Sequence, residues 1–475
     1  MIGLREVLVA PRKIADLTAH LQPGQERMLA AGSMRHHPER TIWHVNSTEH
    51  GGGVAEMLRP MVGYSRALGL PVRWLVLDAP PEFFEITKRI DNGISGVCGD
   101  GGPLGYAEHE VYQSVLARAA AVLEEHVSPG DQVFLHDPQT AGLVGYVRRA
   151  GAVPVWRAHN GADEPNQHTG VAWEFLRAYL RDAHALVFTL PHFAPAWHKS
   201  LASAVIPPFI DPASPKNQPM SERVALSVLA RCDLIDAEPS APPVFTRFDG
   251  TTATAELRPT VVREGRPPSP DSPLVLQVSR WDAVKDMPGV MLGFAEHVAP
   301  RSDATLMLVG PEVTGVADDP EAAQVFDDCV KMWRALDMET RSRIQLVCLP
   351  MADPDVNAAV VNALQRHATV IVQKSLSEGF GLTATEAMWK AKPLVTSAVG
   401  GLRFQVPDLS VGTALTDPLD LRAFGNAVTR YLADPANSRT VGERARARVA
   451  EQFLPDTHLL AELALLRDLS EMVLR

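Results

Sequence analysis

Short apolar runs rich in β-branched residues recur along the whole chain and alternate with stretches whose apolar residues are spaced as in helices. Strands that are apolar throughout are buried on both faces, and strands that alternate with helices form parallel sheets covered by helices. In the first half we expect strands at residues 41–47, 72–78, 132–137, 153–159, 185–189 and 204–208. In the second half we expect them at residues 274–280, 305–310, 344–350, 369–374 and 393–398.

The two series of strands predict an α/β protein with two doubly wound, Rossmann-like domains. Prolines and polar residues crowd together at 207–219, directly after the first series, and this composition is typical of a boundary. We expect an N-terminal domain at 1–212, a C-terminal domain at 213–455, and a helix at 456–475 that packs back on the N-terminal domain. Residues 238–273, rich in Pro, Thr and Asp, predict an elaborated loop or lid.

Composition excludes several classes of protein. The 475 residues are 46% hydrophobic and 21% charged, as in soluble globular proteins, and the net charge of −11 argues against binding to nucleic acid or anionic membrane. The four cysteines (Cys98, Cys232, Cys329 and Cys348) are scattered without a CxxC pair, which favours a reduced, cytoplasmic location and no zinc site. No apolar run reaches the length that spans a bilayer. The 38 prolines and many Ala and Arg residues are typical of a GC-rich bacterial genome.

The carboxyl ends of the predicted strands carry the candidate functional residues, because open parallel sheets bind ligands there. Gly51, Gly52 and Gly53 follow the first strand and precede a helix, so backbone amides could approach an anion closely. A tight strand–helix turn without a ligand would look the same. Arg280 and Lys285 follow the strand at 274–280 and suit a diphosphate, although a solvated pair on a loop is the alternative.

Polar residues also end two neighbouring strands of the first series. Arg157, His159 and Asn160 lie at the end of one strand, and Asp137 ends the other, so these side chains could share one crevice. A histidine in such a place can equally be a structural residue with satisfied hydrogen bonds.

The segment QKSLSEGFGLTATEAM places Glu378 and Glu386 on either side of a glycine turn. If a helix starts near Leu382 and Thr383, its first amides bind a phosphate, and the glycines of the turn Gly379–Phe380–Gly381 let the backbone pass under it. The two carboxylates would then grip sugar hydroxyls at both ends of a nucleotide sugar. An ordinary surface helix could carry both charges but would not need the glycines.

EGFGLTATE resembles the Glu–seven residues–Glu pattern of retaining glycosyltransferases with the GT-B fold, in which two Rossmann-like domains face each other across a cleft. The segments NSTEHGGGVAEML, FFEITKRIDNGISG, HDPQTAGL and VSRWDAVKD resemble the glycosyltransferring trehalose synthases, which join an NDP-glucose to glucose. The resemblance covers roughly residues 40–455. It implies a UDP-, ADP- or GDP-glucose donor, no cofactor and no metal.

The resemblance also implies roles for individual residues. Glu378 would bind the 3- and 4-hydroxyl region of the donor sugar, Glu386 the ribose, and His159 the donor sugar from the N-terminal domain. Arg280 and Lys285 would neutralise the diphosphate and act with Glu378 and His159 as the catalytic set. The remaining donor-binding residues would be Gly52, Gly53, Gly379, Phe380, Gly381, Leu382, Thr383, Asn362 and Gln365.

Two departures from the family pattern concern the acceptor. Asp91 stands where the family has a histidine, and Asn160–Gly161 replaces Ile-Asp. We expect an acceptor site made of Asp91, Asn92, Asp137, Arg157 and Asn160. The alternative for Asp91 is that it only caps a tight turn at Asn92-Gly93.

Four functions remain open from the sequence. Trehalose synthesis leads, followed by transfer from the same donor to a cyclitol, an aminocyclitol or another small acceptor. A trehalose phosphorylase is disfavoured because such relatives carry long extensions, and a non-catalytic sugar-nucleotide sensor could have lost Glu378 or His159. The expected partners are small molecules and, for the protein itself, a second copy in a homodimer.

Overall fold

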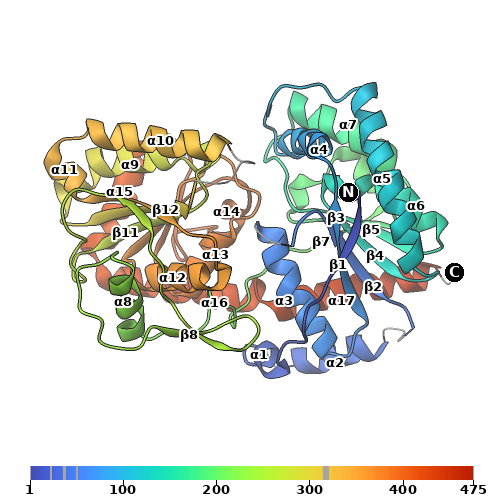
Figure 1. Cartoon of the computed structure of the whole chain (residues 1–475), viewed down its shortest axis with the longest axis horizontal. Helices are drawn as coiled ribbons and strands as arrows, with labels where there is room; N and C mark the ends of the chain where they lie inside the picture. Colours follow the sequence, from blue (N-terminus) through green and yellow to red (C-terminus); the bar gives the residue numbers. More distant parts are fainter. Residues whose placement is uncertain (1, 22–23, 36–38, 50–51, 314–319, 474–475) are drawn as a thin grey trace. The chain divides into compact units, whose positions relative to one another are not determined.

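The computed structural model describes residues 2–21, 24–35, 39–49, 52–313 and 320–473. The chain forms two compact units. One combines Met1–Phe209 with Phe453–Arg475, and the other is Ile210–Gln452. Each unit contains a seven-stranded sheet flanked by helices (Figure 1). The prediction of two mainly parallel α/β sheets is therefore confirmed.

The sheet of the first unit has the strand order β1-β3-β2-β4-β5-β6-β7. Its strands are β1 (Gly3–Val7), β2 (Ile42–Asn46), β3 (Val72–Asp78), β4 (Gln132–His136), β5 (Val153–Ala158), β6 (Ala185–Phe188) and β7 (Ala202–Val205). All neighbours are parallel except the edge strand β1, which runs antiparallel to β3. Because β2 has β3 on one side and β4 on the other, the winding direction reverses between β2 and β4.

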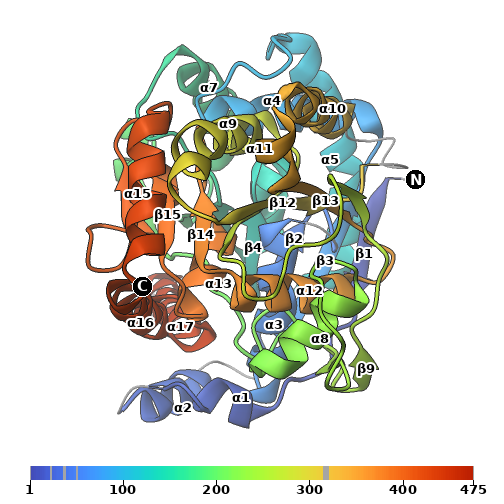
Figure 2. The same ribbon diagram turned by 90° about the vertical axis from the view of Figure 1, so that its left-hand side faces the viewer.

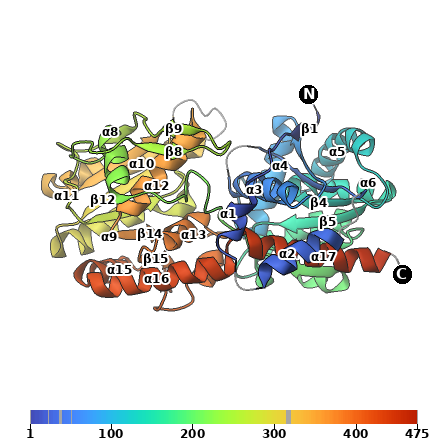
Figure 3. The ribbon, with the colours of Figure 1, turned by 90° about the horizontal axis from the view of Figure 1, so that it is seen from below.

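Helices cover both faces of the first sheet. They are α1 (Ile14–Thr18), α2 (Gln25–Arg35), α3 (Gly53–Ala67), α4 (Pro81–Ile94), α5 (Tyr106–His126), α6 (Val144–Arg149), α7 (Gln167–Leu180) and α17 (Pro455–Val473). The last helix, α17, lies beside α2 and also contacts α3 (Figure 3). Gln132 on β4 donates hydrogen bonds to the carbonyl of Leu466 and to Oγ of Ser470, both at 3.1 Å. The end of the chain therefore completes the core of the unit in which the chain begins.

The second sheet has the strand order β10-β13-β12-β11-β14-β15-β16. Its strands are β10 (Thr260–Val262), β11 (Leu274–Val278), β12 (Thr305–Pro311), β13 (Ile344–Leu349), β14 (Val370–Gln373), β15 (Leu394–Ser397) and β16 (Thr413–Leu415), and a separate hairpin joins β8 (Val244–Thr246) to β9 (Thr252–Thr254). Only the edge strand β10 is antiparallel to its neighbour. Here the winding direction reverses between β11 and β14.

Nine helices are described in the second unit, for the residues that the structure covers. They are α8 (Glu222–Arg231), α9 (Met287–His297), α10 (Pro320–Ala335), α11 (Met338–Ser342), α12 (Pro354–His367), α13 (Leu382–Trp389), α14 (Gly400–Gln405), α15 (Leu421–Ala433) and α16 (Pro435–Gln452). Helices α9 and α10 cover one face of the sheet, and α8, α12 and α13 lie on the other (Figure 2). No helix among the described residues is long and apolar enough to cross a bilayer.

The sequence located most of the strands but not the edges of the sheets. The strand expected at 204–208 is shifted, since β7 spans Ala202–Val205, and β1, β10 and β16 were not predicted. The segment at 238–273 is not only a loop, because it contains β8, β9 and β10, and β10 pairs with β13. Strands of three residues are too short to show an apolar period, and edge strands need not be apolar on both faces.

Gly93 allows α4 to pack closely on α7, and this contact can be tested. A Cβ atom at Gly93 would lie 2.7 Å from Cβ of Ala172 and 3.2 Å from the carbonyl oxygen of His168. We expect Gly93→Ala to lower the melting temperature, because overpacking costs about 1–3 kcal/mol. The control is Gly170→Ala on α7, where a Cβ meets nothing within 4 Å. It should raise the melting temperature, since alanine favours a helix by about 1 kcal/mol over glycine. Equal shifts in the two variants would contradict the packing argument.

Candidate active site

The carboxyl ends of β11 and β14 meet at the point where the second sheet reverses its winding, the usual ligand position in such sheets. Lys285 follows β11 and Glu378 follows β14. Nζ of Lys285 donates to Oε2 of Glu378 at 2.6 Å, and the two side chains are only 14% and 10% exposed. Oγ of Ser375 donates to the same carboxylate oxygen at 3.1 Å. Lys285, predicted to bind the diphosphate, and Glu378, predicted to bind the sugar, therefore form one ion pair.

Hydrogen bonds to backbone carbonyls hold the loop after β11 against the loop after β14 and against its own strand. The N–H of Leu376 donates to the carbonyl of Val284 at 2.7 Å, and Nε2 of Gln277 donates to the carbonyl of Lys285 at 2.8 Å. Arg280 extends further into solvent, with a side chain 59% exposed, and donates to Oδ2 of Asp282 at 2.9 Å. Lys285 is thus fixed against the sheet, whereas Arg280 can reach a ligand.

The glycine turn before α13 is packed too tightly for side chains. Gly381 has φ +86° and precedes the first residue of α13, Leu382. A Cβ at Gly400 would lie 1.7 Å from the carbonyl oxygen of Glu378, and one at Gly401 would lie 2.4 Å from Cα of Phe380. The start of α14 therefore presses directly against the turn.

Gln405 fixes the same turn from α14. Its Nε2 donates to the carbonyl of Phe380 at 2.6 Å, while its Oε1 accepts from Oγ1 of Thr385 at 2.8 Å. The first amides of α13, including those of Leu382 and Thr383, have no carbonyl one turn earlier in the helix to bond. Together with the helix dipole they make this terminus favourable for an anion.

Glu386 lies deeper in the second unit, 4% exposed. Its Oε1 is 3.5 Å from Nζ of Lys216, and its backbone carbonyl accepts from Nζ of Lys390 at 3.2 Å. Nζ of Lys390 also donates to Oδ1 of Asn217 at 2.9 Å. Burial lowers the pKa of Lys390 to about 7, although the carboxylate of Glu386 opposes this shift. This cluster of charged groups was not predicted from the sequence.

Asn362 and Gln365 are both buried inside the second unit. Nδ2 of Asn362 donates to the carbonyls of Pro215 and Gln218 at 3.1 and 3.0 Å, so it ties α12 to the loop after residue 210. Neither polar atom of the Gln365 side chain has a hydrogen-bond partner among the described residues. Both of these hydrogen bonds of Asn362 hold the protein together and leave its Nδ2 engaged within the unit.

In the first unit, β2 and β4 end at the corresponding switch point. Gly52 precedes α3 with φ +83°, a conformation that requires glycine, and Gly53 begins the helix; Gly51 lies outside the described residues. Asp137 follows β4 with φ +61° and ψ 178°, a combination that is strained for any residue with a side chain. Such strain is typical of functional positions.

The predicted acceptor residues Asp91, Asp137 and Asn160 gather at this edge with His159. Oδ1 of Asp137 accepts the backbone N–H of His159 at 2.9 Å, and Nδ2 of Asn160 donates to Oδ1 of Asp91 at 3.2 Å. Burial, followed by the negative charge of Asp91, raises the pKa of Asp137 to about 7. Asp91 lies within α4, so Asn92-Gly93 is helical and the tight-turn alternative for Asp91 is wrong.

Arg157 and Gly161 have contacts that the sequence did not reveal. The guanidinium of Arg157 is fully buried and lies 3.1 Å from Nε2 of His458 on α17, so it points into the core. A Cβ at Gly161 would lie 2.2 Å from the ring of Phe193, which explains why this position has no side chain. Asn92 contacts the Gly99 loop, since a Cβ at Gly99 would lie 2.6 Å from its Nδ2.

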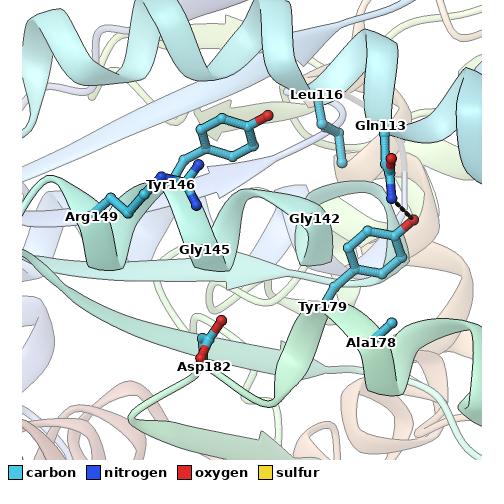
Figure 4. Close-up of a pocket in the computed structure, with 9 residues that line it drawn as sticks. All are labelled: Gln113, Leu116, Gly142, Gly145, Tyr146, Arg149, Ala178, Tyr179 and Asp182. Carbon is cyan, nitrogen blue, oxygen red and sulfur yellow. Dashed lines mark hydrogen bonds between the residues drawn. The ribbon is translucent and has the colours of Figure 1, made fainter.

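A separate pocket of about 210 Å³ lies on the helices of the first unit (Figure 4). It is lined by residues of the α5, α6 and α7 region: Gln113, Leu116, Gly142, Gly145, Tyr146, Arg149, Ala178, Tyr179 and Asp182. Nε2 of Gln113 donates to the hydroxyl of Tyr179 at 3.3 Å across it. None of the predicted site residues lines this pocket. Among the described residues, no group of three or more His, Cys, Asp or Glu side chains is arranged to hold a metal ion.

Comparison with known proteins agrees with this arrangement. Residues 44–195 match the family described as Trehalose synthase, N-terminal domain, and residues 354–448 match Glycosyl transferases group 1. The fold resembles that of an alpha,alpha-trehalose 6-phosphate synthase from Burkholderia multivorans, with a TM-score of 0.67 and 15% identity over 92% of this chain and 98% of that one. The fold and the switch-point residues thus define a glycosyltransferase of the GT-B class.

Two relatives cover nearly the whole chain. The Trehalose synthase of Pyrococcus horikoshii is 31% identical over 430 residues, 90% of each chain. That of Rubrobacter xylanophilus is 31% identical over 435 residues, 89% of each chain. The chain belongs to the trehalose synthase family.

The raised pKa of Asp137 predicts a pH-dependent stability. The pKa rises from an ordinary 3.8 to about 7 on folding, so the ionised carboxylate destabilises the fold, and stability is lost as the pH rises through this interval. Asp137→Asn keeps an oxygen for the His159 N–H but cannot ionise. We expect the variant to be more stable than the unmodified protein at about pH 8, by up to a few kcal/mol, and this advantage to shrink toward about pH 4. The difference between the two melting temperatures measures it at each pH. A difference that is the same at both pH values would contradict this.

Proposed function

We propose that this chain transfers glucose from an NDP-glucose to free glucose, giving trehalose with retention of configuration at the donor's anomeric carbon. The observation that carries the proposal is the Lys285–Glu378 pair at the β11/β14 switch point, next to the N-terminus of α13. A cation beside a helix terminus suits a diphosphate, and the carboxylate suits sugar hydroxyls. Membership of the trehalose synthase family supports the same reaction.

On the donor side, Lys285, Arg280 and the amides of Leu382 and Thr383 neutralise the diphosphate. Lys285 bonds Glu378, and a diphosphate oxygen can take the place of the carboxylate at its ammonium group, which leaves Glu378 for the sugar. Glu386 binds the ribose, and Asn362 supports the nucleotide end by holding the loop of Pro215 and Gln218. A comparison of UDP-, ADP- and GDP-glucose as donors identifies the preferred nucleotide.

On the acceptor side, Asp91 and Asn160 bind the hydroxyls of the second sugar, and His159 contacts the donor sugar. The Asn160–Asp91 hydrogen bond holds the two side chains in a fixed relation before the acceptor arrives. Asp137 supports the group by bonding the backbone of His159. A cyclitol or aminocyclitol acceptor is the second candidate, because the carboxyl groups of Asp91 and Asp137 lie near each other, and an amine would be attracted to them.

The reaction needs no covalent enzyme intermediate in this proposal. The acceptor hydroxyl oxygen bonds to the anomeric carbon as the bond from that carbon to the diphosphate oxygen breaks. The hydroxyl proton passes to the departing diphosphate. The protein contributes charge stabilisation by Lys285 and Arg280 and the positioning of both sugars. All four cysteines are free, and this supports a reduced cytoplasmic compartment as the site of action.

The direct experiment is a product assay. The purified protein is incubated with UDP-, ADP- and GDP-glucose, each with glucose, a cyclitol and an aminocyclitol, and products are identified by NMR. We expect α,α-linked trehalose from one or more donors with glucose. A glycosylated cyclitol without trehalose would replace the first candidate by the second, and no transfer with any pair would refute both.

Lys285 is expected to be necessary for turnover. Lys285→Met keeps an unbranched side chain of similar length but removes the charge, so kcat should fall by roughly two to four orders of magnitude, as for other lost charge-stabilising groups. The control is Lys331→Met on α10, whose ammonium group pairs with Asp328 at 2.9 Å and is 68% exposed. Steady-state kinetics with saturating donor and acceptor measure both. A Lys285→Met enzyme with near-normal kcat would make the diphosphate assignment wrong.

Asp91 is expected to act on the acceptor alone. Asp91→Ala removes a carboxylate that accepts hydroxyl or amine protons, so the apparent KM for the acceptor should rise about tenfold or more, while the donor KM changes little. Glu174→Ala is the control, because Glu174 is 75% exposed on α7. If Asp91→Ala lowers only the melting temperature and leaves the acceptor KM unchanged, Asp91 has a structural role.

A further inference from the structure

A row of buried polar side chains joins the C-terminal helix to His159. Three adjacent strands contribute one histidine each, counting the residue that follows β5. Nδ1 of His44 lies 3.1 Å from Nε2 of His136, and Nδ1 of His136 lies 2.9 Å from Nε2 of His159. Nε2 of His44 faces Oε1 of Glu462 on α17 at 3.7 Å. All four side chains are buried, and His159 is the most exposed at 8%.

The three imidazoles are neutral. Burial lowers the pKa of His44 to about 3, and burial together with nearby imidazoles and Arg157 holds those of His136 and His159 well below the ordinary value. A neutral imidazole has one nitrogen that donates and one that accepts. Because each contact in the row needs one donor and one acceptor, the tautomers of the three rings are set together.

Only two arrangements satisfy both histidine–histidine contacts with neutral rings. If Nε2 of His44 carries the proton and points it at an ionised Glu462, then Nε2 of His136 and Nε2 of His159 are also protonated, and Nδ1 of His159 is an acceptor. If Glu462 is protonated and donates to Nε2 of His44, every ring is reversed and Nδ1 of His159 is a donor. The charge of Glu462 thus selects one arrangement.

We propose that Glu462, acting through His44 and His136, sets the tautomer of His159. The tautomer decides whether Nδ1 of His159 accepts a hydrogen bond from the sugar or donates one to it. This rests on the role proposed above for His159. Among the described residues, Nδ1 of His159 has no hydrogen-bond partner, which leaves it for a ligand. Glu462, His44 and His136 are positioning residues, because they act on the sugar only through His159.

The change between the two arrangements balances. One proton enters at Nδ1 of His159, and the proton on its Nε2 passes to Nδ1 of His136. The proton on Nε2 of His136 passes to Nδ1 of His44, and the proton on Nε2 of His44 passes to Glu462. Each ring is neutral before and after, so the core gains no imidazolium ion, and one carboxylate is neutralised.

The gap between His44 and Glu462 is the longest in the row. At 3.7 Å it exceeds the usual N–H···O distance of about 3 Å by roughly 0.7 Å, which a small movement of either side chain closes. Nε2 of His44, which faces this gap, is buried without a hydrogen-bond partner among the described residues. Leaving such groups unsatisfied is unfavourable, so closing the gap stabilises the fold.

The groups that face Glu462 place its ionisation near neutral pH. Burial raises the pKa of Glu462 to about 7, and the charge of Arg157 on β5 opposes the shift. His458 lies 3.9 Å from Oε2 of Glu462, but its Nε2 accepts from Nη1 of Arg157 and its Nδ1 donates to the carbonyl of Pro207 at 2.9 Å. It therefore has no proton for Glu462. The charge of Asp137, directly after β4, also acts on Arg157.

The test is the ¹⁵N NMR signature of His159 in the whole protein, labelled at its 16 histidines, with no ligand needed. His159→Gln identifies the resonances of His159. Above the pKa of Glu462 we expect the Nε2–H tautomer, and below it the Nδ1–H tautomer. His44→Phe, which keeps an aromatic ring against Phe134, and Glu462→Gln should each give a tautomer that no longer changes with pH. Glu471→Gln, exposed on the same helix, should behave as the unmodified protein.

Kinetics supply a second readout. In the unmodified enzyme the donor KM should change by about threefold to tenfold across the same pH interval, the worth of one neutral hydrogen bond, and this change should be absent in His44→Phe. A His159 tautomer that does not change with pH, or that still changes in His44→Phe, would overturn the proposal. If the protein shows the expected NMR pattern but transfers no sugar, the proposed function is wrong, whereas the coupling of Glu462 to the tautomer of His159 is supported. Melting curves show whether each variant is folded.

Discussion

The pairing of β11 with β14 is the constraint on which the donor-side chemistry depends. Nearly a hundred residues separate the two strands, and two other strands are formed in between, yet the sheet places them side by side. Their loops must diverge to the two faces of the sheet, and a ligand site opens between them. Lys285 and Glu378 come together only because of this reversal. A different strand order would leave both residues at strand ends but out of reach of each other.

The central strands and the residues at their ends could be predicted from the sequence, since both leave a local signal. Glu378 and Lys285 come after apolar runs, and the glycines on both sides of Phe380 predict a turn. The sequence explained the turn but not its tight packing, because the start of α14, which packs against the turn, lies twenty residues further on. The edge strand β16 has only three residues, too few to show a period, and β1 is only partly buried, so it lacks the continuous apolar run of a central strand.

Contacts over long separations could not be predicted at all. Arg157 seemed suited to the acceptor because it shares a strand end with His159, but its guanidinium is bound by His458, 301 residues away. No residue near Arg157 in the sequence indicates that His458 is its partner. His136 did offer a signal, since it directly precedes Asp137, but a histidine inside an apolar strand is usually read as part of the core. Its distance of 2.9 Å from His159 appears only in three dimensions.

The first unit is made from both ends of the chain, and this has a consequence for how the protein is synthesised. Ile210–Gln452 is one continuous segment, so all its strands have left the ribosome before α17 is complete. The N-terminal sheet is made first, but until α17 arrives it lacks the buried Leu459 and Leu466 and the partner of Arg157. The usual order, in which domains fold from the N-terminus onward, is therefore reversed for the final step. A chain cut after Gln452 would contain every residue of the second unit, but its first unit would lack α17.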